Sequence, residues 1–196
     1  MKQLTISLFL FLLSTTSLLA NPFIKGYYFT LDGKKVEGHI NFRRSAYNLF
    51  RNSPSDIKFK ENLDSKAVKL TPNDISSFVI GTDSFTIAHN IKINNLYAGI
   101  FPKDFVQVLI SGRMNLAMHR SSSHDGRYAY EHNNYVIYKS DETCLTIWRI
   151  KNQKEDIAKF FVDFPTLQSK IMEKGFTYDN LPALVQEYNE LSSMRE

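Results

Sequence analysis

The sequence predicts an α+β protein in which an antiparallel, β-rich body is followed by a group of C-terminal helices. Apolar and polar residues alternate with a period of two from residue 23 to about residue 150, a pattern typical of half-buried strands. Beyond that point the apolar residues recur with a period of about 3.6, which indicates amphipathic helices. Strands that precede helices, rather than alternating with them, favour segregated packing of the two.

The first strands are bounded by turn motifs. Residues 27–31 form a β-rich run that stops at Asp32-Gly33, which predicts a two-residue hairpin. Residues 36–42 form the return strand, whose alternate apolar residues share one face. A Thr-Pro-Asn-Asp sequence predicts a turn at residues 71–74. Shorter strands are expected at residues 57–59, 67–70, 75–80 and 85–87.

The later strands are more apolar. Residues 105–110 are almost all apolar, which suggests a strand buried on both faces. An alternating strand is expected at residues 114–118, and residues 135–138 and 143–150 predict a last hairpin; residues 90–101 fit neither period. We expect about eight to ten short strands in a sandwich-like or partly closed sheet, because a large open sheet tends to curl.

Three C-terminal amphipathic helices are expected between about residues 153 and 193. The first has apolar residues at i, i+3, i+4 and i+7, namely Ile157, Phe160, Phe161 and Phe164. Pro165 suits the first turn of the second helix, which we expect to end at Gly175. Asp179 is expected to cap the third helix. The apolar faces of these helices need a surface to cover, and the strands provide the nearest one.

The first twenty residues predict a secretory signal peptide. Lys2 supplies a positive start, residues 4–13 are mostly apolar, and Ala20 is a small residue at the expected cleavage position. A membrane anchor fits less well, because the uninterrupted apolar stretch is far shorter than the roughly 20 residues of a spanning helix. We therefore expect export to the periplasm or extracellular space, and a mature chain, residues 21–196, that has no transmembrane span and forms a single α+β domain.

Composition excludes several classes of protein. The 196 residues are 43% hydrophobic and 22% charged, which is ordinary for a globular protein and too apolar for a disordered one. A single cysteine cannot form an intramolecular disulfide. The formal net charge of +4 is too small to predict a nucleic-acid partner, and export argues further against one.

Three segments resemble parts of a known group of proteins. Gly-Tyr-Tyr-Phe-Thr-Leu-Asp-Gly at residues 26–33, with the return strand at 36–40, resembles a hairpin shared by small exported β-rich proteins of Bacteroidota-type bacteria. The strand and turn at residues 105–112 and the helix end at residues 184–189 are similar to segments of the same family. The resemblance implies export and the fold class, and since the family has no established activity it implies no site residues.

The segment 43–70 concentrates positive charge, with a net charge of +4 and aromatic residues interleaved. Cations and rings together can hold a polyanion. The candidate contacts are Arg43, Arg44, Arg51, Lys58 and Lys60. The expected partner is an acidic glycan, an anionic envelope component or another exported protein. The alternative is that these cations occupy the solvent side of edge strands, where they prevent edge-to-edge pairing.

A second polar cluster holds His119, His124 and His132. Imidazoles can bind zinc, but the spacing is irregular, and the alternative is a solvated loop between two strands. Ser123-His124-Asp125 does not indicate a hydrolase, because the members of a catalytic triad come from separate parts of a chain. We therefore assign no catalytic residue, no metal ligand and no cofactor.

The leading hypothesis is an exported, non-enzymatic binding or scaffolding domain. The alternatives are a small hydrolase of an envelope or glycan substrate that uses the histidine cluster, and a carrier of an apolar ligand held between the sheet and the first helix. A set of aromatic residues on the expected last strands could stabilise the sheet or form a ligand platform. Its members are Tyr128, Tyr130, Tyr135, Tyr138 and Trp148.

Overall fold

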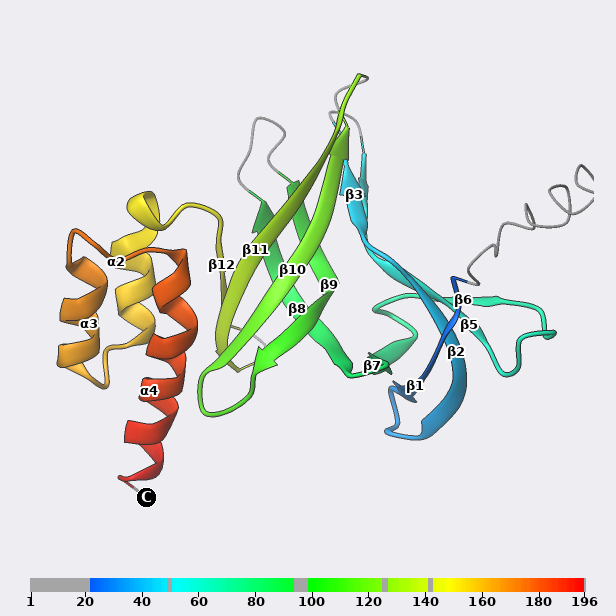
Figure 1. Cartoon of the computed structure of the whole chain (residues 1–196), viewed down its shortest axis with the longest axis horizontal. Helices are drawn as coiled ribbons and strands as arrows, with labels where there is room; N and C mark the ends of the chain where they lie inside the picture. The colour runs from blue at the N-terminus through cyan, green and yellow to red at the C-terminus, as the bar shows by residue number, and fades with distance from the viewer. Residues whose placement is uncertain (1–21, 49–50, 94–98, 125–126, 141–142, 196) are drawn as a thin grey trace, which may run out of the picture.

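Strands make up most of the structure, and a few helices follow them (Figure 1). The computed structural model describes residues 22–48, 51–93, 99–124, 127–140 and 143–195. The predicted signal peptide lies outside the described residues. Within the described ranges, no helix has both the length and the apolar character needed to cross a membrane.

The β-rich body with C-terminal helices is confirmed. Its strands are β1 (Ile24–Thr30), β2 (Lys35–Arg43), β3 (Ser45–Tyr47), β4 (Asn52–Ser53), β5 (Asp56–Lys60), β6 (Val68–Leu70), β7 (Ile75–Ile80), β8 (Asp83–Ile93), β9 (Gly99–Ile110), β10 (Asn115–His124), β11 (Ala129–Ser140) and β12 (Thr143–Ile147). The helical elements are α2 (Ile150–Phe160), α3 (Pro165–Met172), the 3-10 turn η1 (Tyr178–Asn180) and α4 (Leu181–Ser193).

The strands form one curled, open sheet in the order β12-β11-β10-β9-β8-β7-β1-β2-β5-β6, in which all neighbours are antiparallel. The curl brings β12 back toward β8, where the backbone N–H of Lys92 donates to Thr146 Oγ1 at 3.3 Å. The helices and the β1-β2-β5-β6 portion lie at opposite ends of the long axis (Figure 1).

The first hairpin has a longer turn than expected. The N–H of Thr30 donates to Lys34 O and that of Gly33 donates to Thr30 O, both at 3.0 Å, so three residues form the loop. Gly33 has a φ of 85°, the left-handed conformation that this kind of loop requires at its last position. The prediction of a two-residue hairpin was therefore wrong by one residue.

Residues 119–124 of the polar segment are strand rather than loop, and Asp125 lies outside the described residues. Residues 115–124 of β10 pair with residues 129–138 of β11 in one uninterrupted antiparallel register. Ser121 is 1% exposed and Ser123 is 7% exposed, so the serines that suggested a solvated loop lie inside the curl of the sheet. Local composition misled here because pairing with β11 overrides the weak strand preference of serine.

The helical prediction is matched in part. Ile157 and Phe161 are fully buried and Phe164 is 5% exposed, as their spacing indicated. The last helix begins as the turn η1, capped by Thr177, whose N–H donates to Asn180 Oδ1 at 2.8 Å; Asp179 is not its cap. The second helix, α3, ends at Met172, before Gly175.

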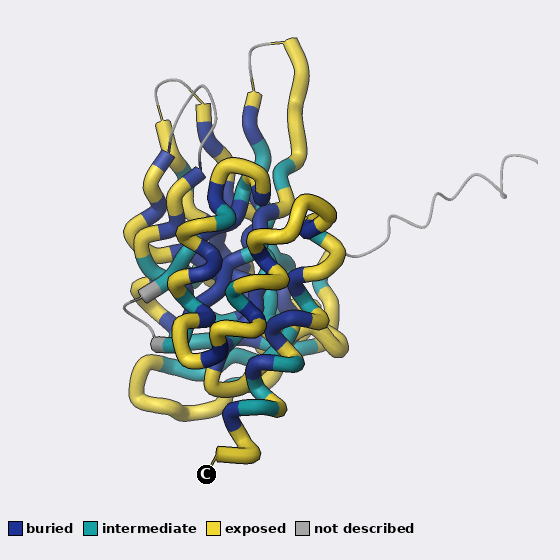
Figure 2. The backbone as a smooth tube through the Cα atoms, turned by 90° about the vertical axis from the view of Figure 1, so that its left-hand side faces the viewer, coloured by how far each residue is buried: buried dark blue, intermediate teal, exposed yellow. Residues whose placement is uncertain are grey.

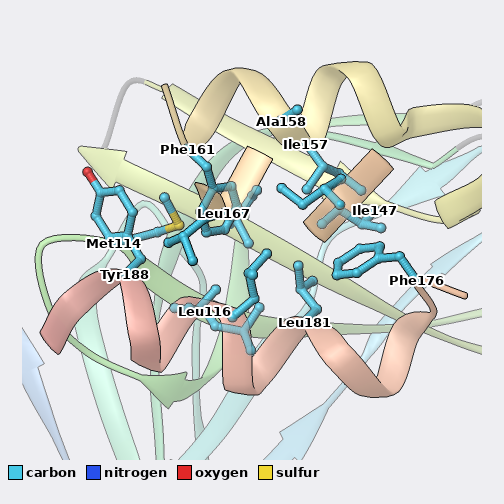
Figure 3. Close-up of a cluster of buried hydrophobic side chains, with 14 of the residues drawn as sticks. Met114, Leu116, Ile147, Ile157, Ala158, Phe161, Leu167, Phe176, Leu181 and Tyr188 are labelled. Carbon is cyan, nitrogen blue, oxygen red and sulfur yellow. The ribbon is translucent and has the colours of Figure 1, made fainter. Parts of the chain in front are cut away.

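Buried side chains form three clusters. Figure 2 marks the buried residues along the backbone in dark blue. The first joins the helices to β10, β11 and β12 through Leu116, Ile137 and Ile147. Figure 3 shows Leu116 and Ile147 among the side chains of this cluster. The second lies inside the curl of β8 to β11 and includes Tyr47 of β3. The third lies under β2, β5 and β7 and includes Ile40.

A short insertion separates part of β9 from β10. The two strands pair where residues 116–118 face residues 107–110. Farther along β10, residues 121–123 pair in parallel with Ser45–Tyr47 of β3, which continues from β2, and β4 pairs with β3. The β3-β4 hairpin therefore occupies the space where β9 and β10 diverge (Figure 1).

Gly38 permits the close packing of β2 against β5. A Cβ at this position would lie 2.3 Å from Lys60 O and 2.6 Å from the Phe59 ring. We expect Gly38→Ala to lower the free energy of unfolding by about 2 kcal/mol or more, because the backbone oxygen cannot move out of the way. Urea denaturation measures the change.

The matched control is Gly175→Ala, since nothing lies within 4 Å of its would-be Cβ. We expect this exposed change to stay within about 0.5 kcal/mol of the unsubstituted protein. Equal stability of the two variants would contradict the close packing at Gly38.

Candidate functional site

The solvent side of β1, β2, β5 and β6 carries basic residues on adjacent strands. Lys25, His39 and Lys60 are direct cross-strand neighbours. In the next row, Lys58 on β5 lies opposite Lys69 on β6. We call this surface the basic face and define it by Lys25, His39, Arg43, Lys58, Lys60 and Lys69.

The alternation of the strands places these side chains in solvent. Ile40 and Ile57 are fully buried and Phe59 is 7% exposed, and all three pack in the third cluster. Because successive side chains of a strand point to opposite faces, burial of these residues turns Lys58 and Lys60 outward. The apolar core thus determines which face is basic.

One buried carboxylate offsets part of the charge. Asp56 is 1% exposed, and its Oδ2 accepts from Arg43 Nε at 3.0 Å and lies 3.2 Å from Lys69 Nζ. Lys60 Nζ donates to Leu63 O at 2.7 Å. Lys58 has no ion-pair partner within the described part of the chain. Positive charge therefore exceeds negative charge on the basic face.

The neighbouring acidic residue, Glu37, does not neutralise the basic face. Lys35 Nζ donates to Glu37 Oε1 at 2.6 Å. This hydrogen bond is the main reason that the pKa of Glu37 is lowered, so Glu37 is ionised and paired with Lys35 at neutral pH. Lys58 and Lys69 are like charges on directly opposed residues, an arrangement that costs free energy in a sheet.

The five candidate contacts do not lie together. Arg43, Lys58 and Lys60 belong to the basic face. Arg44 points elsewhere and pairs with Glu131 of β11, with Nη1 and Oε1 3.0 Å apart. Arg51 precedes β4 and lines a small pocket of about 110 Å³ beside β10. The segment 43–70 thus supplies cations to two separate surfaces.

Sequence reasoning missed Lys25 and His39, and it placed Lys69 in the basic segment 43–70 without naming it as a candidate contact. The hairpin register places Lys25 opposite His39, and a correct pairing of β1 with β2 from the sequence would have found both. Lys69 lies on the basic face because β6 pairs with β5. The sequence of a strand of only three residues does not show which strand it pairs with.

A buried polar network lies at the β3-β4 insertion. Asp104 and His119 are fully buried, with His119 Nε2 2.7 Å from Asp104 Oδ2. Ser45 Oγ lies 3.1 Å from the same nitrogen. Asp104 Oδ1 accepts from the N–H groups of Ser55 at 2.8 Å and Phe105 at 3.0 Å. The network joins β3, β9, β10 and the residue before β5.

The network contains Ser, His and Asp but lacks the geometry of a hydrolase triad. In a triad the imidazole contacts the hydroxyl through one nitrogen and the carboxylate through the other. Here Ser45 and Asp104 both contact Nε2 of His119, and its Nδ1 is buried without a hydrogen-bond partner among the described residues. Complete burial also keeps substrate away, so the network serves to hold strands together.

The other two histidines of the cluster do not converge on His119. His132 Nε2 lies 2.8 Å from Ser123 Oγ, and its ring is tilted against that of Tyr47 at 5.5 Å. Burial lowers the pKa of His132, so it is neutral at neutral pH. His124 is exposed at the end of β10. Among the residues with a described placement, no three His, Cys, Asp or Glu side chains are grouped to hold a metal.

The aromatic residues of the last strands divide between core and surface. Tyr135 stacks on Tyr178 with ring centroids 5.1 Å apart, and Tyr138 is 9% exposed. Tyr128 and Tyr130 are exposed, and their rings are 6.4 Å apart. The set is therefore no continuous ligand platform.

The apolar face of the first helix is filled by protein side chains. The rings of Phe161 and Phe164 meet the buried Tyr188 ring edge-on, at centroid distances of 5.6 and 5.2 Å. Met114 and Leu116 of the sheet side are fully buried in the same cluster (Figure 3). A ligand held in this interface would have to displace these contacts.

Comparison with known proteins does not place the chain in a family. No protein-family model matches it, and no curated protein or solved structure matches it significantly. Its function has to be inferred from its own residues.

We expect Asp104→Ala to lower the free energy of unfolding by about 3 to 5 kcal/mol. The change removes the acceptor for the buried His119 and for the N–H groups of Ser55 and Phe105, which water cannot reach. Urea denaturation followed by circular dichroism gives the difference.

The control is Asp64→Ala, which removes an exposed carboxylate from the turn after β5 and should change stability by about 0.5 kcal/mol or less. If Asp104→Ala unfolds at the same urea concentration as this control, the network does not hold the strands.

Proposed function

We propose that the protein is an exported, non-enzymatic binding protein whose basic face contacts a polyanion. The observation that supports this most is a set of four lysines in two rows, Lys25-His39-Lys60 and Lys58-Lys69, on adjacent strands of one sheet face. Repulsion between opposed cations is relieved when an anion lies between them. The expected ligand is an acidic glycan or an anionic component of the envelope.

The spacing of a sheet suits a repeating anion. Adjacent strands lie about 4.8 Å apart and alternate residues along a strand about 6.5 Å apart, so the cations form a two-dimensional array. Each exposed ion pair is weak, at most about 1 kcal/mol. Several pairs on one chain of anionic groups add up, because binding of the first raises the local concentration of the next.

Aromatic rings border the cations. Tyr27 and Phe29 lie on the same face of β1, opposite Glu37 and Lys35, with ring centroids 5.7 Å apart in an edge-to-face arrangement. Lys60 Nζ lies 5.0 Å from the centroid of the Phe23 ring. Rings next to cations favour sugars that carry acidic groups, because the ring can pack on the sugar while the cation binds the anion.

The hydrolase alternative has less support. The histidine cluster that suggested it splits between a sealed network at His119, a neutral and half-buried His132 and an exposed His124. A general acid or base needs access to substrate, which His119 lacks. Binding at the basic face needs no such group.

We expect Lys58→Gln/Lys60→Gln to elute from immobilised heparin at lower salt and to raise the Kd for heparin about three- to tenfold. Two cations are lost from adjacent positions of the array, while the buried neighbours Ile57 and Phe59 are unchanged. Vesicles of phosphatidylglycerol, tested in parallel, separate a glycan preference from a lipid preference.

The matched control is Lys92→Gln/Lys103→Gln, which removes two exposed lysines from β8 and β9. This variant has the same net charge as Lys58→Gln/Lys60→Gln, and it should bind heparin like the unsubstituted protein. Equal loss in both variants means that overall charge, and not the basic face, governs retention, and the proposal fails. Retention that about 0.1 M salt abolishes equally in all three proteins has the same meaning.

A further inference from the structure

A pocket lies at the helical end of the molecule, far from the basic face. A pocket of about 600 Å³ opens between the start of α2 and the segment that joins α3 to η1. This volume is within the range of small-molecule sites. Its apolar lining comes from Ile150, Phe176 and Tyr178, of which the first two are 7% and 9% exposed.

Packing behind the pocket holds its aromatic wall in place. The Tyr178 ring stacks on Tyr135, and its hydroxyl donates to Ile147 O. Burial raises the pKa of Tyr178 to about 12, so the phenol is neutral at physiological pH and adds no negative charge. Phe176 lies at one end of the helix–sheet core in Figure 3, and its N–H donates to Glu173 O at 3.2 Å.

The rest of the lining is Thr177 and three lysines. Lys151, Lys154 and Lys174 line the pocket, and of the described residues that line it none is acidic. Lys154 Nζ donates to Glu173 O, which ties α2 to the connection after α3. Lys151 and Lys174 have no ion-pair partner in the parts of the chain that are described.

The start of α2 adds to the positive potential. The helix has eleven residues, its first turn contains no acidic residue, and no side chain caps its N-terminus. The aligned peptide dipoles therefore leave partial positive charge beside Ile150 and Lys151. The nearby carboxylate of Glu187 lines a different pocket and is paired with Lys170, with Nζ and Oε1 2.7 Å apart.

We propose that this pocket binds a small amphipathic anion, a carboxylate or sulfonate on an aromatic or acyl body. The apolar body packs against Ile150, Phe176 and Tyr178, and the anionic group lies between Lys151 and Lys174. A neutral apolar molecule would leave the lysines without a counter-charge, and an inorganic anion would leave the apolar wall in water. The two requirements together select an amphiphile with one negative end.

The test uses two dyes that share an aromatic body. Anilinonaphthalene sulfonate carries a negative charge, and N-phenyl-1-naphthylamine is the same ring system without it. We expect the sulfonate dye to bind saturably and more tightly than the neutral dye. The chain has a single tryptophan, Trp148, just before α2, so a dye in the pocket should quench tryptophan emission.

Lys151→Gln/Lys174→Gln should raise the Kd of the sulfonate dye about tenfold and change that of the neutral dye by less than about twofold. Lys92→Gln/Lys103→Gln is the matched control and should leave the binding of both dyes unaffected. The proposal is overturned if the pocket variant keeps its affinity for the sulfonate dye, or if it loses both dyes equally. Heparin binding and dye binding are both measured on all three double variants, so failure at one site is distinguishable from failure at the other.

Discussion

The buried contact between Asp104 and His119 is the interaction on which the arrangement of the strands depends. It lies where β9 and β10 stop pairing and β3 enters between them. Backbone hydrogen bonds cannot hold strands that have diverged, so side chains take over this role. Ser45 and Ser55 complete the network from the inserted hairpin and the residue before β5. Removing one partner of this hydrogen bond lowers the stability of the fold, because the other partner is then left buried without its hydrogen bond.

Both proposed binding sites depend on this junction without touching it. β3 is the direct continuation of β2, so anchoring Ser45 next to His119 also sets the direction in which β2 leaves the curled sheet. The basic face lies on that strand and its neighbours. On the opposite side, β10, β11 and β12 carry the helices, and the pocket at Phe176 lies at their edge. The two sites are therefore held at a distance by the same sheet.

Part of the basic face was predictable and part was not. Lys58 and Lys60 alternate with Ile57 and Phe59, so their outward direction follows from strand geometry alone. Their neighbours do not follow, because β5 pairs with β2 across the intervening β3-β4 hairpin. That hairpin carries Arg51 to another surface, although Arg51 is closer in sequence to Lys58 than Lys25 is.

The sequence by itself determined the local elements: the change of period near residue 150, and the inward direction of Phe161 and Phe164. These depend on the side-chain periods of strands and helices, which are properties of short segments. The tertiary structure alone decided that His119, Ser121 and Ser123 of β10 are buried strand residues. Buried polar groups need hydrogen-bond partners, and those of His119 come from Ser45 and Asp104, at other places in the chain. The local sequence pattern of residues 119–124 does not reveal partners that come from elsewhere in the chain. Only the assembled sheet therefore distinguishes this segment from a solvated loop.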